Sequence, residues 1–175
     1  MKFDWKIYLL IASILMFSVF AIFLQKVMVF IMFILLTCSI ALFVRFVPVL
    51  KYIGVEFITL STIFIGFIYG PVTGAVYGTA LLLAHLLIGD YYIGVYFVWL
   101  LPEYALLGFL SGAFSSSISS LSLFLIVGMN VLNLILTGFL EGDRLGKHLP
   151  YVVGNIVINC AIMILFFDSV IKIID

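Results

Sequence analysis

An acidic side chain stands inside a long apolar stretch of the sequence. The stretch reads VWLLPEYALLGFLSG over residues 98–112, and Glu103 follows Pro102 near its centre. A charged carboxyl at the middle of a membrane span costs at least about 2.5–3.5 kcal/mol, so such a residue is by default a candidate for function. The alternative is a buried pair between helices, with His85 or an asparagine as the partner of Glu103.

Aromatic side chains accompany this carboxyl. Trp99 precedes Glu103 by four residues, which places both on one helix face, and Tyr104 follows directly. An aromatic wall beside an acceptor is typical of pockets for planar, polar or cationic small molecules. Pro102 also frees a backbone carbonyl of the preceding turn, which adds an acceptor. The alternative for Trp99 is a position in the interfacial aromatic belt.

Two pairs of asparagines lie within other apolar runs. Asn130 and Asn133 are three residues apart and Asn155 and Asn159 are four apart, so each pair shares a helix face. Amides in a membrane normally turn inward and hydrogen-bond across helices, and this structural role is the alternative to binding. The candidate substrate-binding residues are therefore Trp99, Glu103, Tyr104, Asn130, Asn133, Asn155 and Asn159.

The composition requires a membrane environment. The 175 residues are 66% hydrophobic and 9% charged, with a mean hydropathy of +1.42, whereas soluble domains carry roughly 25% charged residues. The formal net charge is zero and there is no basic tail, so nothing indicates a nucleic-acid partner. We expect a single multi-pass transmembrane domain over residues 1–175, in the cell (plasma) membrane.

Sequence motifs for catalysis or metal binding are absent. There is no H-E-x-x-H, no G-x-S-x-G and no phosphate-binding G-x-x-x-x-G-K-[ST] pattern. Cys38 and Cys160 lie within apolar runs and lack the spacing of metal ligands. The sequence thus predicts neither an enzyme nor a bound metal or cofactor.

The apolar runs predict an all-α protein. A spanning helix needs about 20 mostly apolar residues, and on that measure the predicted helices cover roughly 7–24, 26–47, 54–69, 71–88, 95–113, 120–140 and 151–172. The pair Gly70-Pro71 ends the third helix, because proline cannot continue it. We interpret the first apolar run as a membrane span and not as a signal peptide, because it is followed by QKVMVF and not by a cleavage site of small residues.

The connections between these helices differ in polarity. If every helix spans, the polar connections at 45–56, 89–96 and 141–150 lie on one side, and the connections on the other side are nearly bare. Arg and Lys residues concentrate on the polar side, which favours the cytoplasm. Functional charges can mislead so small a count, and the sequence leaves the orientation open.

Small residues recur four apart around the third and fourth predicted helices and again in the fifth. They are Gly66, Gly70, Gly74 and Gly78, followed by Gly108 and Gly112. This spacing allows helices to approach closely. It predicts tight internal packing or, alternatively, a sliding or docking surface for another membrane protein.

Three stretches occur in a recognisable order: GFIYGPVTGAVYG at a helix corner, GDYYIGVYF in the following loop and LPYVVGNIVIN at the last helix. On these stretches the sequence, from about residue 27 to its end, resembles the substrate-binding S component of energy-coupling factor (ECF) vitamin transporters. It implies a six-helix core over 26–172, to which helix 7–24 is an addition. It also implies capture of a vitamin-like solute beneath extracellular loops, energised by a separate coupling subunit and ATPases. LLPEYALLGFLSG looks most like the thiamine-specific members.

Two features depart from that family. One is the added N-terminal helix. The other is the missing Ala-x-x-x-Ala docking motif, for which Thr37 and Ala41 are the nearest small pair. The alternative function is an MreD-like membrane scaffold or another non-enzymatic polytopic protein, which would have no pocket and a stable partner. A small polytopic enzyme that uses Glu103 or His85 is a third hypothesis, which the missing motifs disfavour.

Overall fold

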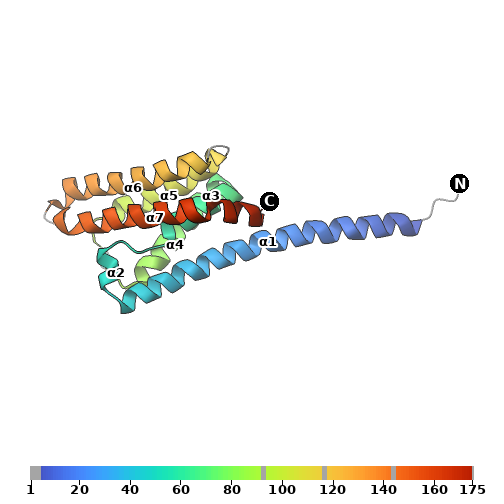
Figure 1. The fold of residues 1–175 in the computed structure, drawn as a ribbon, viewed down its shortest axis with the longest axis horizontal. Coiled ribbons are helices and arrows are strands. Elements are labelled where there is room, and N and C mark those ends of the chain that lie inside the picture. Colours follow the sequence, from blue (N-terminus) through green and yellow to red (C-terminus); the bar gives the residue numbers. More distant parts are fainter. Residues whose placement is uncertain (1–4, 92–93, 116–117, 143–144, 175) are drawn as a thin grey trace.

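The computed structural model describes residues 5–91, 94–115, 118–142 and 145–174, and this part of the chain is helical without a strand (Figure 1). Its helices are α1 (Trp5–Phe46), α2 (Val49–Tyr52), α3 (Ile58–Tyr69), α4 (Pro71–Ile88), α5 (Phe97–Ala113), α6 (Ile118–Leu140) and α7 (Leu145–Ile174). Among the described residues, the segments long and apolar enough to cross a membrane are Leu24–Phe46, Pro71–Ile88, Ser120–Leu140 and His148–Lys172. These are the properties of an α-helical membrane protein.

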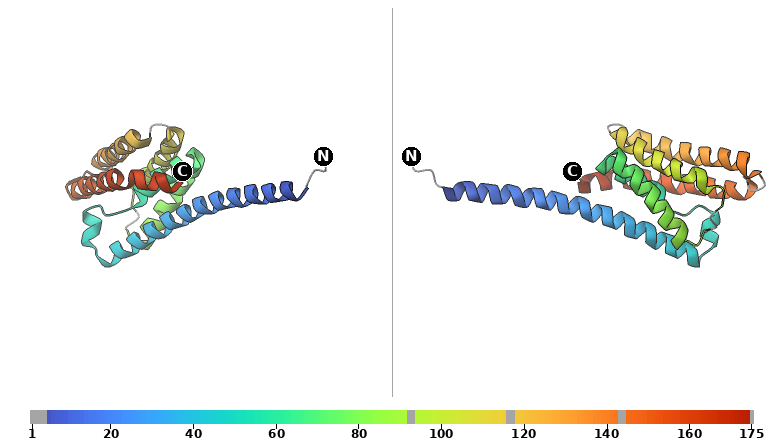
Figure 2. Two further views of the ribbon diagram at one scale, coloured as in Figure 1. Left: turned by 45° about the vertical axis from the view of Figure 1, so that its right-hand side comes forward. Right: turned by 180° about the vertical axis from the view of Figure 1, so that it is seen from behind.

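Helix α1 is a single helix where the sequence predicted two. Residues 7–24 and 26–47 were expected to be separate, but one helix of 42 residues runs through Gln25 and Lys26. The reason is local, because glutamine and lysine are good helix formers and no glycine or proline occurs in α1. Its C-terminal part packs on α3 and α4, and its N-terminal part leads away from the other helices (Figure 2).

Helix α3 lies at the centre of the bundle and begins later than predicted. It contacts α1, α4, α5, α6 and α7, and every residue from Ile58 to Gly66 is buried. The predicted start at residue 54 is wrong, because Gly54 has a φ of +69° and packs against the α7 backbone at Tyr151. Residues 53–57 therefore form a non-helical segment that leads into the bundle.

The small residues form the contact between α3, α4 and α5. A Cβ atom added to Gly108 would clash with the backbone of Gly74, and one added to Gly74 would clash with the carbonyl of Gly108. A Cβ atom on Gly66 would meet Ser111 of α5. The predicted tight packing is confirmed, and the glycines are used within the molecule. The corner itself follows the prediction, since Gly70 takes a φ of +92° between α3 and α4.

The remaining helices keep their predicted places with shifted ends. The helix predicted over 95–113 begins at Phe97, and the one predicted over 120–140 begins at Ile118. The last helix, predicted over 151–172, runs from Leu145 to Ile174 with Pro150 inside it. Helices α6 and α7 pack side by side (Figure 2). Helix α2, the C-terminal end of α6 and the N-terminal end of α7 lie at the same end of the bundle (Figure 1).

Candidate functional site

A cavity of about 370 Å³ opens within the bundle. All three polar connections contribute to its lining, through Lys51 and Tyr52, through Tyr91 and Tyr96, and through Glu141 and His148. The helices supply the rest: Ile58, Thr59, Leu82, His85, Leu86, Leu100, Glu103, Tyr104, Leu107, Met129, Asn130, Asn133, Thr137, Tyr151 and Asn155. Residues of the predicted polar face thus line the cavity; residues 92–93 and 143–144 of these connections lie outside the described residues.

The lining combines aromatic and polar side chains. Five tyrosines contribute to it: Tyr52, Tyr91, Tyr96, Tyr104 and Tyr151. Their rings give an apolar contact surface, and the amides and carboxyls between them give points of attachment. Burial raises the pKa of the Tyr91 phenol above its ordinary value, so this group is neutral at physiological pH.

Most of the predicted site residues line this cavity. Glu103, Tyr104, Asn130, Asn133 and Asn155 do so, from three different helices. Trp99 and Asn159 were predicted in the same wall, and neither lines the cavity. Each instead contacts a residue that does. The Trp99 indole N–H donates to Oδ1 of Asn133 at 3.4 Å, and Asn159 Nδ2 donates to Oδ1 of Asn155 at 3.0 Å.

Glu103 has no partner among the described residues. Its side chain is 5% exposed, and neither carboxyl oxygen accepts a hydrogen bond. The alternative, a buried pair with His85 or an asparagine, does not form among the described residues, and Nδ1 of His85 is likewise buried there without a hydrogen-bond partner. A buried polar group left unsatisfied costs about 1–3 kcal/mol, more if it is charged. Both side chains therefore face the cavity with unused hydrogen-bonding capacity.

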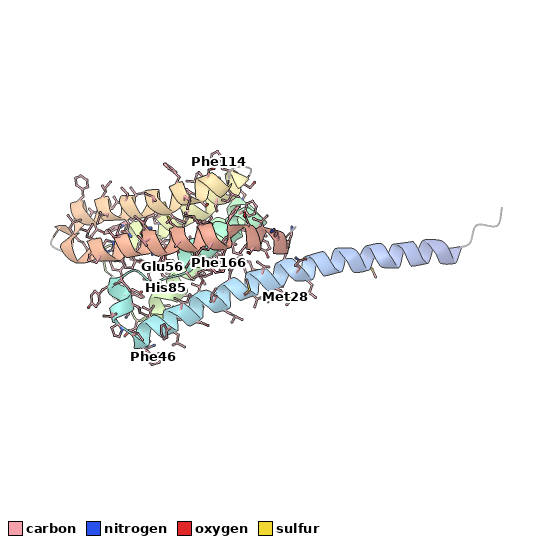
Figure 3. The ribbon with its side chains drawn as sticks, in the orientation of Figure 1. Met28, Phe46, Glu56, His85, Phe114 and Phe166 are labelled. Atoms are coloured by element: carbon pink, nitrogen blue, oxygen red, sulfur yellow. The ribbon has the colours of Figure 1, made fainter. Side chains whose placement is uncertain are left out.

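Glu56 is the residue that sequence reasoning missed. It was counted with a polar connection, yet its side chain is only 2% exposed. Glu56 and His85, whose side chain is 4% exposed, both lie within the bundle (Figure 3). Its Oε2 accepts the backbone N–H of Thr59 at 3.1 Å, in the first turn of α3, where a negative charge is favoured. A signal was present, since Glu56 directly precedes an apolar run and stands three residues before a threonine.

Lys51 ties two of the polar connections together across the cavity mouth. Its ammonium donates to the backbone carbonyl of Asp90 at 2.8 Å and lies 4.8 Å from the centre of the Tyr91 ring. Asp90 holds a φ of +55°, which is uncommon for a residue other than glycine. The Tyr91 ring in turn lies 5.2 Å from that of His85. The mouth is therefore bounded by side chains that contact one another.

Comparison with known proteins gives no relative for this chain. No protein-family model, curated protein or solved structure matches it. Among the described residues there is also no group of three or more histidine, cysteine, aspartate or glutamate side chains that could hold a metal ion.

Proposed function

We propose that the protein captures a small, vitamin-like solute from one side of a membrane. The observation that carries the proposal is the cavity itself, in which the unpartnered Glu103 carboxyl faces a space bounded by tyrosines. The volume of about 370 Å³ lies within the range of about 300–1,000 Å³ that is usual for small-molecule sites. A scaffold has no need of such a space.

The unsatisfied side chains indicate which solutes fit. A cationic group with N–H donors would donate hydrogen bonds to both Glu103 oxygens, and the tyrosine rings favour a solute with a planar or cationic body. Buried polar side chains without a hydrogen-bond partner among the described residues gain one when the solute binds. This gain offsets the cost of their desolvation and contributes to the binding free energy. Selectivity then follows from the few polar anchors and affinity from aromatic contact.

The wider proposal follows the resemblance to ECF S components. In it, residues 26–172 act as a six-helix capture unit in the plasma membrane, and residues 7–24 extend the first of these helices at its N-terminal end. A coupling subunit and ATPases, supplied by other chains, would energise release. Because the glycines of α3, α4 and α5 pack against one another inside the molecule, the surface that docks on a coupling subunit would be another exposed helix face.

A thermal-shift experiment tests the proposed function. The full chain in lipid nanodiscs is heated with a panel of water-soluble vitamins and with benzamidine, each at millimolar concentration. At least one solute is expected to raise the unfolding temperature, since a ligand at 100 times its Kd stabilises the folded state by about 2.7 kcal/mol. If no solute shifts the temperature, and cross-linking in membranes recovers a stable partner, the scaffold alternative is favoured.

A further inference from the structure

A buried network of hydrogen bonds lies directly behind the cavity wall. Its centre is the Glu56 carboxyl group, whose two oxygens accept four hydrogen bonds. Oε1 accepts from the Thr59 hydroxyl at 2.7 Å, from Asn155 Nδ2 at 2.7 Å and from Asn159 Nδ2 at 3.2 Å. Glu56 does not line the cavity, but Thr59 and Asn155 do.

This carboxylate fixes the orientation of the Asn155 amide. The Asn155 NH₂ group donates to Glu56 Oε1 and, at 3.2 Å, to the carbonyl of Gly54, so both of its protons face acceptors. Its Oδ1 must then point the other way, toward Nδ2 of Asn130 at 2.8 Å and Nδ2 of Asn159 at 3.0 Å. Every polar position of Asn155 is occupied within the network.

The orientation of the Asn155 amide in turn fixes that of the Asn130 amide. The Asn130 NH₂ group donates to Asn155 Oδ1 and, at 2.9 Å, to the carbonyl of Ile126. Both of its donors are used, and its Oδ1 accepts nothing from the described residues. Because Asn130 lines the cavity, the group it can offer to a solute is an acceptor.

The same carboxylate fixes the Tyr104 hydroxyl. Thr59 has one hydroxyl proton, and it lies on the 2.7 Å bond to Glu56. In the 3.0 Å contact between Thr59 Oγ1 and the Tyr104 hydroxyl, Tyr104 must therefore be the donor. Its own proton is thus used, and it too offers only lone pairs to the cavity.

We propose that Glu56 determines the specificity of the cavity by making the wall of Tyr104 and Asn130, next to Glu103, a surface of hydrogen-bond acceptors. The inference rests on the proposed function and adds a class of solute to it, namely one that presents several N–H or O–H donors along one edge. The polarity reverses at Asn133, whose Oδ1 is taken by Trp99 and Thr137, so that its NH₂ group remains for an acceptor. A solute with donors along one edge and an acceptor beyond them fits this pattern.

Two neutral probes of matched shape test the inference without a change of charge. Benzamide carries an NH₂ group where acetophenone carries a methyl group. Each is titrated against the full chain in nanodiscs by saturation-transfer NMR, with empty nanodiscs subtracted. The wild type is expected to bind benzamide about tenfold more tightly, because only benzamide supplies donors to the acceptor wall.

Two substitutions then act on the network. Glu56→Gln replaces one of the two acceptor oxygens by an NH₂ group, so at least one of the four donors around this side chain then faces another donor. The amides and Tyr104 lose their fixed orientation, and the preference for benzamide is expected to fall to about threefold or less. Thr59→Val removes the acceptor of the Tyr104 proton at nearly constant volume. Tyr104 can then donate into the cavity, and acetophenone is expected to bind about threefold more tightly or better. This gain is measurable even if Glu56→Gln does not fold.

The matched control is Asp168→Asn, which makes the same carboxylate-to-amide change on the exposed side of α7 and is expected to leave the preference unchanged. A wild type that binds neither probe, or binds both equally, overturns the inference. So does a Thr59→Val variant that gains no affinity for acetophenone. In those cases the proposed function still stands if the vitamin panel raises the unfolding temperature, and it falls with the inference if the panel has no effect.

Discussion

Glu103→Gln is expected to weaken the binding of benzamidine about tenfold or more, with no loss of thermal stability. Both oxygens of Glu103 are buried at the cavity and have no hydrogen-bond partner in the part of the chain that the structure describes, and an amidinium donates two parallel N–H bonds to a carboxylate. Hydrogen bonds to charged groups contribute about 1.5–3 kcal/mol, which corresponds to about tenfold or more in affinity. Stability is kept because no described residue hydrogen-bonds to the Glu103 carboxyl, so a neutral amide of the same size breaks no such bond.

Isothermal titration of the full chain in nanodiscs measures this effect, with the unfolding temperature as the check on folding. Asp168→Asn is the matched control, because it removes one carboxylate from an exposed position of α7. It is expected to retain the affinity of the wild type. Unchanged benzamidine binding in Glu103→Gln would remove Glu103 from the site, and loss of folding would assign it a structural partner.

Gly108→Leu is expected to prevent the formation of a stable, monodisperse protein. At this position the added side chain would meet the Gly74 carbonyl and, 2.7 Å from its Cβ, the backbone nitrogen of Ala75. These are backbone atoms of α4, which cannot turn aside as a flexible side chain does. Adding even small groups to a packed core typically costs about 1–3 kcal/mol, and a leucine that separates two helices costs more. The loss also removes a cavity wall, since α5 carries Glu103 and Tyr104.

Size-exclusion chromatography and thermal unfolding in detergent measure the consequence. The control is Gly128→Ala in α6, where an added Cβ has no atom within 4 Å. That change is expected to be neutral or slightly stabilising, because alanine favours a helix by about 1 kcal/mol over glycine. A Gly108→Leu variant that unfolds at the wild-type temperature would show that α4 and α5 do not pack through their glycines.

Local chemistry decided which parts of the fold could be predicted. The boundary between α3 and α4 follows from Gly70 and Pro71 alone, and α4 covers the predicted residues 71–88. Length alone placed the break near residue 25, where no residue interrupts the helix. The start of α3 depends on the packing of Gly54 against α7, a contact about a hundred residues away in sequence, which no local pattern reveals.

The same division applies to the candidate site. Glu103 could be found because a carboxyl within an apolar run is visible in one dimension. Glu56 was missed, because it borders a polar connection and becomes buried only when residues 53–57 enter the bundle. Trp99 shares a helix face with Glu103, but its indole reaches Asn133 on α6 and stays outside the cavity lining. Helix periodicity predicts which residues share a helix face, but the packing of the neighbouring helix determines which atoms that face contacts.

Native mass spectrometry of the full chain, released from nanodiscs after purification without added solute, tests solute capture most directly. The wild type is expected to carry a non-lipid molecule of low mass, and Glu103→Gln prepared in parallel is expected to carry little or none. An unliganded wild type that also binds no member of the vitamin panel would contradict solute capture, as would a bound molecule retained fully by Glu103→Gln and identified as lipid.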